Sequence, residues 1–179
     1  MPSLFQHLQS ILLSSTRLFS GLTQKDRQPQ VPSWPSLKAQ IRAEFPTVKH
    51  IGITDLEQHL LPTQQEKTLI VDVRAPEEFA VSHLKGAVNL EDPEAILQLA
   101  QQQQAEQIVL YCSVGYRSAQ MAQMIEEQGW DAVVNFEGSI FEWANSGRPV
   151  FLKSEEVEVV HPFDPVWGKL LDGQYHPTE

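Results

Sequence analysis

The feature that most constrains the fold is a repeated alternation between short β-branched apolar runs and stretches with apolar residues at helical spacing. Residues 68–73 read Thr-Leu-Ile-Val-Asp-Val, and residues 108–111 read Ile-Val-Leu-Tyr. Apolar runs of this length are typical of strands buried on both faces of a parallel sheet. Because helical stretches and short connections separate the runs, the sequence predicts an α/β fold. We expect a mostly parallel five-stranded sheet with helices on both faces.

The remaining elements are predicted from weaker local signals. Further strands are expected over 48–51, 86–90 and 132–135. Helices are expected over 36–45, from 54 to 61, from 76 to 81, and over 93–104, 117–128 and 139–145. Thr54 and Glu57 have the spacing of a capping box, which predicts Thr54 as a helix N-cap. Met124 is expected among the apolar positions of the helix over 117–128.

Three parts of the chain are predicted. Residues 1–35 hold an amphipathic N-terminal helix and a polar linker, residues 47–152 form the sheet-bearing domain, and residues 153–179 form an acidic tail. The linker is placed from residue 24 to about 36, where three prolines interrupt a polar stretch. The aromatic residues of the tail, Phe163 and Trp167, favour packing of the tail back on the domain.

The apolar residues of segment 3–22 fall at helical spacing. This pattern is typical of contact with a membrane surface, of an organelle-targeting peptide, or of a helix that packs on this domain or on a second copy. A secretory signal is not indicated, because the segment lacks early Lys or Arg and a continuous apolar core. We therefore expect a cytoplasmic location, with an organelle or a peripheral membrane location as the alternatives.

Composition excludes several classes of protein. The formal net charge is -10, which disfavours nucleic acid as a partner because phosphate binding needs a cationic face. The chain has a single cysteine, so a disulfide-stapled scaffold and a zinc site of several cysteines are excluded. The sequence contains no run of 18 apolar residues, so it does not predict a transmembrane helix.

The single cysteine, Cys112, lies between the strand over 108–111 and the following helix. Backbone N–H groups of the loop and the helix N-terminus are expected to point toward its sulfur and to stabilise a thiolate. Gly115 lets the loop curl, and Arg117 at the helix start is expected to reach an anion above it. Ser118 is expected to cap the helix or to donate to the sulfur. A buried strand-end cysteine and a surface arginine explain this order of residues less well.

Residues 112–118, Cys-Ser-Val-Gly-Tyr-Arg-Ser, resemble the active-site loop of rhodanese-like sulfurtransferases. The resemblance covers about residues 47–152 in the order of the family. It includes the blocks at 71–74, 76–79, 83–89, 137–143 and 147–150. The resemblance implies a rhodanese-like α/β fold.

The resemblance also implies a ping-pong reaction without metal or organic cofactor. The Cys112 thiolate would take a sulfane sulfur from thiosulfate or a persulfide and pass it to cyanide, a small thiol or a protein acceptor. The substrate would lie against the loop residues Ser113, Val114, Gly115, Tyr116, Arg117 and Ser118. Asp72 and Arg74 are expected to support the site as a structural ion pair.

Other functions fit the sequence less well. A phosphatase or arsenate reductase is disfavoured, because only four residues separate Cys112 from Arg117 and such a loop is too short for a phosphate cradle. Ser113 stands where many thiosulfate-using members carry a basic residue, so a persulfide is expected to be a better donor than thiosulfate. The alternative function is a non-catalytic docking module, recruited to a membrane by the N-terminal segment. The retained Cys112, Gly115 and Arg117 argue against it.

Overall fold

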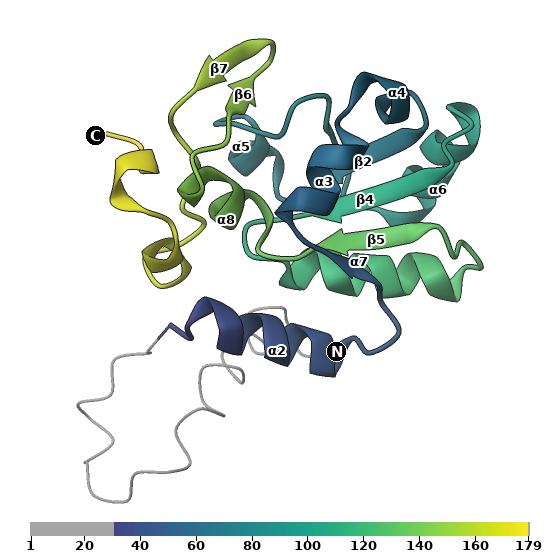
Figure 1. The fold of residues 1–179 in the computed structure, drawn as a ribbon, viewed down its shortest axis with the longest axis horizontal. Coiled ribbons are helices and arrows are strands. Elements are labelled where there is room, and N and C mark those ends of the chain that lie inside the picture. The colour runs from purple at the N-terminus through teal and green to yellow at the C-terminus, as the bar shows by residue number, and fades with distance from the viewer. Residues whose placement is uncertain (1–30, 179) are drawn as a thin grey trace, which may run out of the picture.

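The computed structural model describes residues 31–178 and has a five-stranded parallel sheet at its centre (Figure 1). The strands are β1 (His50–Ile51), β2 (Thr68–Asp72), β3 (Val88–Asn89), β4 (Gln107–Tyr111) and β5 (Val133–Phe136), in the order β1-β5-β4-β2-β3. Every neighbouring pair is parallel. The predicted α/β fold with a five-stranded sheet is therefore confirmed.

The two longest apolar runs form the middle of this sheet. β2 and β4 pair along their whole length, from Thr68 beside Gln107 to Asp72 beside Tyr111. Four of the five residues in each strand are buried, as expected for strands covered on both faces. This register places the carboxyl ends of β2 and β4 side by side, and Cys112 is the residue that follows β4.

Seven helices are described within residues 31–178. They are α2 (Trp34–Glu44), α3 (Ile53–His59), α4 (Pro62–Gln65), α5 (Pro76–Phe79), α6 (Pro93–Gln102), α7 (Tyr116–Glu127) and α8 (Ser139–Asn145). α7 packs on β4 and β5 and touches α6, whereas α4 contacts β2 and α3. The helices thus surround the sheet (Figure 1).

Three local predictions are wrong. Thr54 lies inside α3; the N-cap is Gly52, whose N–H donates to the Asp55 carboxylate at 3.1 Å. Met124 is 44% exposed, because it lies on the outer side of α7. The linker ends before residue 36, because α2 begins at Trp34, with Pro35 in its first turn, where a missing N–H costs no helical hydrogen bond.

The C-terminal segment after the sheet was expected to pack on the domain, and it does. It begins with an antiparallel hairpin, β6 (Val150–Leu152) and β7 (Glu155–Val157), and ends in short 3₁₀ helices over 167–170 and 173–175. Its buried side chains, Val160, Trp167 and Leu171, belong to the same hydrophobic core as the sheet. Figure 1 shows this segment, in yellow, on the side toward which the strands point.

The division of the chain at residues 35, 47 and 152 stays a prediction. The amphipathic segment 3–22 lies outside the described residues. Within residues 31–178, no helix is both long and apolar enough to cross a membrane.

Candidate active site

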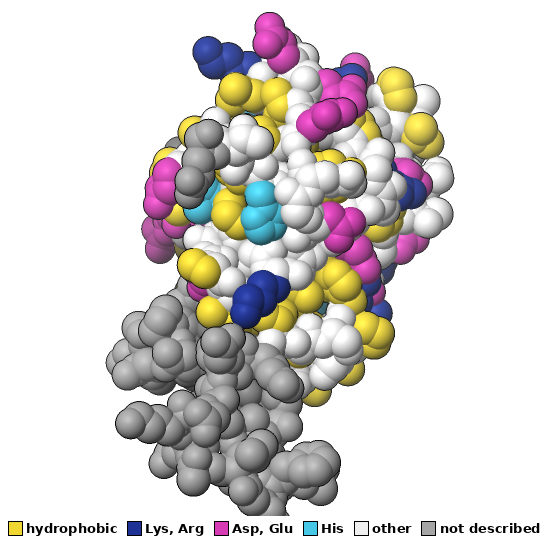
Figure 2. Space-filling view, turned by 90° about the vertical axis from the view of Figure 1, so that its left-hand side faces the viewer, with side chains coloured by type: hydrophobic (Ala, Val, Ile, Leu, Met, Phe, Trp, Pro, Cys, Tyr) yellow, Lys and Arg dark blue, Asp and Glu magenta, His cyan; other side chains and the backbone are white. Residues whose placement is uncertain are grey.

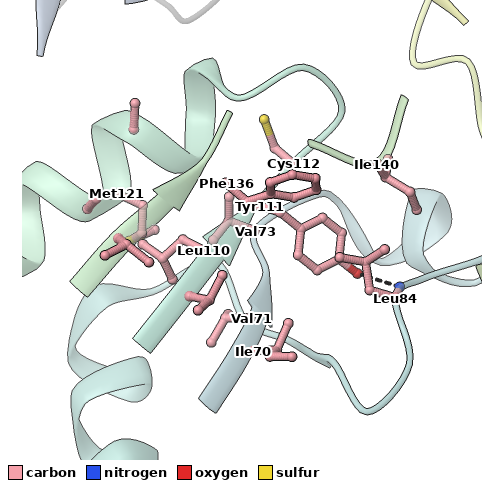
Figure 3. Close-up of a cluster of buried hydrophobic side chains, with 14 of the residues drawn as sticks. Ile70, Val71, Val73, Leu84, Leu110, Tyr111, Cys112, Met121, Phe136 and Ile140 are labelled. Atoms are coloured by element: carbon pink, nitrogen blue, oxygen red, sulfur yellow. Dashed lines mark hydrogen bonds between the residues drawn. The ribbon is translucent and has the colours of Figure 1, made fainter. Parts of the chain in front are cut away.

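Cys112 lies at the carboxyl end of the central strand β4. In parallel sheets this edge is where ligands bind, because the loops into the following helices meet there. Figure 3 shows the Cys112 side chain at the margin of the buried cluster, with its sulfur directed away from core residues such as Leu110 and Val71. Below it, the Tyr111 hydroxyl accepts a hydrogen bond from the Leu84 N–H at 3.0 Å.

The loop after β4 curls around the sulfur. The N–H of Gly115 donates to Cys112 Sγ at 3.1 Å, and the Ser118 hydroxyl lies 3.6 Å from the same atom. Gly115 has φ 104°, a conformation that glycine adopts without strain. A Cβ there would lie 3.2 Å from the backbone nitrogen of Gly138. The loop therefore needs glycine at this position, and Ser118 contacts the sulfur as expected.

The pKa of the Cys112 thiol is shifted from its ordinary value by opposing effects. Burial acts to raise the pKa of the Cys112 thiol, because a buried thiolate loses hydration. The charge of Arg117 and the hydrogen bonds from Ser118 and Gly115 act in the opposite direction and prevail, so the pKa of Cys112 lies below its ordinary value. A lowered pKa increases the thiolate fraction, and the thiolate is the nucleophilic form of cysteine.

Glu78 is a site residue that the sequence reasoning missed. Its carboxylate, on α5, accepts hydrogen bonds from both terminal nitrogens of Arg117 at 2.8 Å and from the Ser113 hydroxyl at 3.0 Å. Burial acts to raise the pKa of Glu78, but Arg117 and Arg74 outweigh it, so its pKa is lowered. The sequence signal at this position, an acidic residue in the first turn of a short helix, indicates only a favourable helix-dipole interaction.

Arg117 is near the loop as expected, but its terminal nitrogens are engaged. Besides Glu78, it donates to the Ser113 hydroxyl at 3.0 Å. The Phe163 ring covers its guanidinium, with 4.8 Å between the guanidinium carbon and the ring centroid. Arg117 also lines the pocket beside Cys112, so the expectation that its guanidinium reaches an anion above the loop stays a prediction. Its charge still acts on Cys112 at short range.

Backbone groups of the loop are held by α8. Cys112 N–H donates to the Ser139 hydroxyl at 3.0 Å, and the carbonyls of Cys112 and Ser113 accept from the N–H groups of Ile140 and Phe141. Asn135 on β5 donates to the Gly115 carbonyl at 3.1 Å. These supporting partners come from segments distant in sequence, and no local pattern predicted their contacts.

Tyr116 joins the loop to α2. Its hydroxyl donates to Glu44 at 2.6 Å, and its ring packs edge-on against Phe45 with 5.3 Å between centroids. Burial and the neighbouring Glu44 carboxylate raise the pKa of Tyr116. Val114, by contrast, lines a small pocket beside Cys112.

Asp72 and Arg74 form a fully buried ion pair at the end of β2. The shortest contact, from Arg74 Nη2 to Asp72 Oδ2, is 2.7 Å, and the same nitrogen donates to the Ser82 carbonyl at 2.6 Å. Asn89 donates to the carbonyls of both Asp72 and Arg74. The pair thus connects the end of β2 to later loops, which is the structural role expected for it.

A small pocket lies above Cys112. Its lining consists of Cys112, Ser113, Val114, Tyr116, Arg117, Phe163 and Trp167. Its space is about 20 Å³, enough for roughly one water-sized group. Two of the lining residues, Phe163 and Trp167, belong to the C-terminal segment.

The fold and this loop define a class: an α/β protein that holds a thiolate-stabilising loop at the carboxyl end of a parallel sheet. The profile of the rhodanese-like domain family matches residues 55–146. The chain belongs to the rhodanese-like family, and the resemblance inferred from its motifs is confirmed.

Individual relatives agree with this assignment. A sulfurtransferase of Allochromatium vinosum is 32% identical over 103 residues, which cover 58% of this chain and 94% of that protein. An uncharacterized protein of Synechocystis sp. is 32% identical over 111 residues, but the match spans only 61% of its length. These similarities support a role of the sulfurtransferase type.

A solved structure shows the same fold. Thiosulfate sulfurtransferase from Pseudomonas aeruginosa superposes with a TM-score of 0.55 at 14% identity, over 71% of this chain and 24% of that one. At this identity the likeness concerns the fold alone.

Proposed function

We propose that this protein transfers sulfane sulfur through a persulfide on Cys112. The observation that carries the proposal is the environment of Cys112 Sγ, which accepts the Gly115 N–H at 3.1 Å and has a pKa below the ordinary value. The same donors would stabilise the anion of a persulfide, whose terminal sulfur carries the charge.

Loading begins with attack of the Cys112 thiolate on the outer sulfur of a donor. With thiosulfate, the S–S bond of the donor breaks, an S–S bond to Cys112 forms, and sulfite leaves with the electron pair. With a persulfide R–S–SH, the leaving group is the thiolate R–S⁻, which then takes a proton.

Unloading reverses the roles. The thiolate of an acceptor, or cyanide, attacks the outer sulfur of the Cys112 persulfide and releases the Cys112 thiolate. The products are an acceptor persulfide or thiocyanate. We further propose a small thiol or a protein thiol as the acceptor and the cytoplasm as the location.

Intact mass tests this mechanism. The wild type should gain one sulfur atom on incubation with glutathione persulfide, and less readily with thiosulfate, and cyanide should remove it. Cys112→Ser should gain none, because the chain has no other cysteine. Absence of a gain with either donor would contradict the proposal and favour a docking role.

A further inference from the structure

The pocket above Cys112 is lined in part by residues from outside the matched family region. That region ends at residue 146, whereas Phe163 and Trp167 line the pocket beside Cys112 and Arg117. Trp167 is 4% exposed, so its side chain is packed into the protein. Access to the sulfur thus depends on the C-terminal segment of this chain.

Phe163 is held in place by its neighbours. Its backbone has φ 66°, an uncommon conformation for a residue with a Cβ. Its N–H donates to His161 Nδ1 at 3.1 Å, and the Asp164 carboxylate accepts from the N–H groups of Val166 and Trp167, each at 2.7 Å. The turn that carries both aromatic rings is therefore hydrogen-bonded on either side of Phe163.

This arrangement removes the attraction that an anionic donor needs. Among the described residues that line the pocket, Arg117 is the only cation; Glu78 pairs with its terminal nitrogens and Phe163 covers its face. A dianion that entered the pocket would lose its hydration and would find no unpaired cation to compensate for the loss. Its transfer from water into the pocket is therefore unfavourable in free energy. Lys and Arg side chains are also few and scattered on the visible face toward which the strands point (Figure 2).

We propose that Phe163 and Trp167 are specificity-determining residues, which admit slender neutral or singly charged sulfur carriers, such as terminal persulfides, and exclude dianionic thiosulfate. The preference for persulfides rests on the proposed sulfur transfer. The exclusion of anions does not, because it concerns any reagent that must reach Cys112.

Alkylation measures this exclusion independently of sulfur transfer. Iodoacetamide and iodoacetate have similar sizes but differ by one negative charge, and both react with the single cysteine. After normalisation to a free small thiol, we expect the wild type to favour iodoacetamide by about tenfold. Phe163→Ala uncovers the Arg117 face and should reduce this preference by about fivefold.

Leu170→Ala is the matched control, because Leu170 packs on the core from the same segment but is not among the pocket residues. It should keep the wild-type preference. Phe163→Leu provides a second variant that retains apolar bulk without the aromatic face, in case Phe163→Ala does not fold. An unchanged preference in a Phe163 variant with a wild-type circular dichroism spectrum would overturn the proposal.

Sulfur loading, followed by intact mass, tests the substrate class. With thiosulfate and the persulfide of a small uncharged thiol as donors, Phe163→Ala should raise thiosulfate loading relative to persulfide loading by about fivefold. An unchanged ratio in a folded variant overturns the assignment of Phe163. If neither donor loads the wild type while the alkylation preference behaves as expected, the proposed sulfur transfer fails but anion exclusion at Cys112 stands.

Discussion

At the scale of single residues, the acidity of Cys112 is a balance of opposing effects. Burial disfavours the thiolate, whereas the Arg117 charge and hydrogen bonds from Ser118 and Gly115 favour it. Arg117 is itself bound to Glu78, so the net charge beside the sulfur belongs to an ion pair rather than to a free cation. The reactivity of Cys112 therefore depends on the Glu78 carboxylate as well as on Arg117.

Replacement of Arg117 should raise the pKa of Cys112. Arg117 is the largest influence that lowers this pKa, so Arg117→Gln should shift the midpoint of the iodoacetamide alkylation rate to higher pH. Since the thiolate is the reactive form, the rate at neutral pH should fall by about tenfold. The rate is measured from about pH 5 to pH 10.

Two variants control this prediction. Arg148→Gln removes an arginine that pairs with Glu57 away from the loop, and its midpoint should equal that of the wild type. The double variant Arg117→Gln/Glu78→Gln avoids a buried unpaired carboxylate and should also shift upward, by less than the single variant. A wild-type midpoint in Arg117→Gln would show that its charge does not act on the sulfur.

At the scale of elements, the C-terminal segment approaches the site through close backbone contacts. A Cβ on Gly168 would lie 2.9 Å from Pro162 Cβ and 3.1 Å from the Pro162 carbonyl oxygen. Pro162 directly precedes Phe163, and Gly168 follows Trp167. The two pocket residues are thus positioned by a contact that only a glycine allows.

Gly168→Ala should destabilise the protein by about 1–2 kcal/mol, because the added methyl group must displace Pro162. The melting temperature should fall by about 3–6 °C, as followed by circular dichroism. Gly173→Ala is the control from the same segment, since a Cβ there meets nothing within 4 Å. Equal melting temperatures for the two variants would mean that Pro162 moves aside without lowering the free energy of unfolding.

At the scale of the whole molecule, the hydrophobic core extends beyond the matched family region. Leu37, Ile41 and Phe45 on and beside α2 are buried in the same cluster as the sheet, together with Val160, Trp167 and Leu171. The ion pairs Arg42–Glu137 and Lys38–Glu142 also join α2 to the segment around α8.

A chain cut to residues 47–152 should therefore be much less stable than residues 31–178. Burial of six apolar side chains contributes about 10 kcal/mol, which is comparable to the total stability of a typical domain, about 5–15 kcal/mol. We expect the short chain to unfold at far lower urea concentration or to aggregate. A urea midpoint equal to that of residues 31–178 would instead show that 47–152 is an independent domain.

Prediction from sequence succeeded where local pattern and structure coincide. The strands over 68–73 and 108–111 and the helix over 139–145 were located to within one residue at each end, because burial on both faces and helical periodicity are visible locally. Thr54 was assigned wrongly as a cap because Gly52 and Asp55 offer an equivalent local bond. Choosing between two such caps requires the tertiary structure.

The sequence by itself determined the α/β class, the family and the place of Cys112 between a strand and a helix. These follow from short-range patterning and from motifs whose residues are neighbours in the chain. Only the tertiary structure decided that Glu78 neutralises Arg117 and that Phe163 and Trp167 wall the pocket. The reason is physical: these contacts join residues 39 to 55 positions apart in the chain, and their existence depends on how the elements pack.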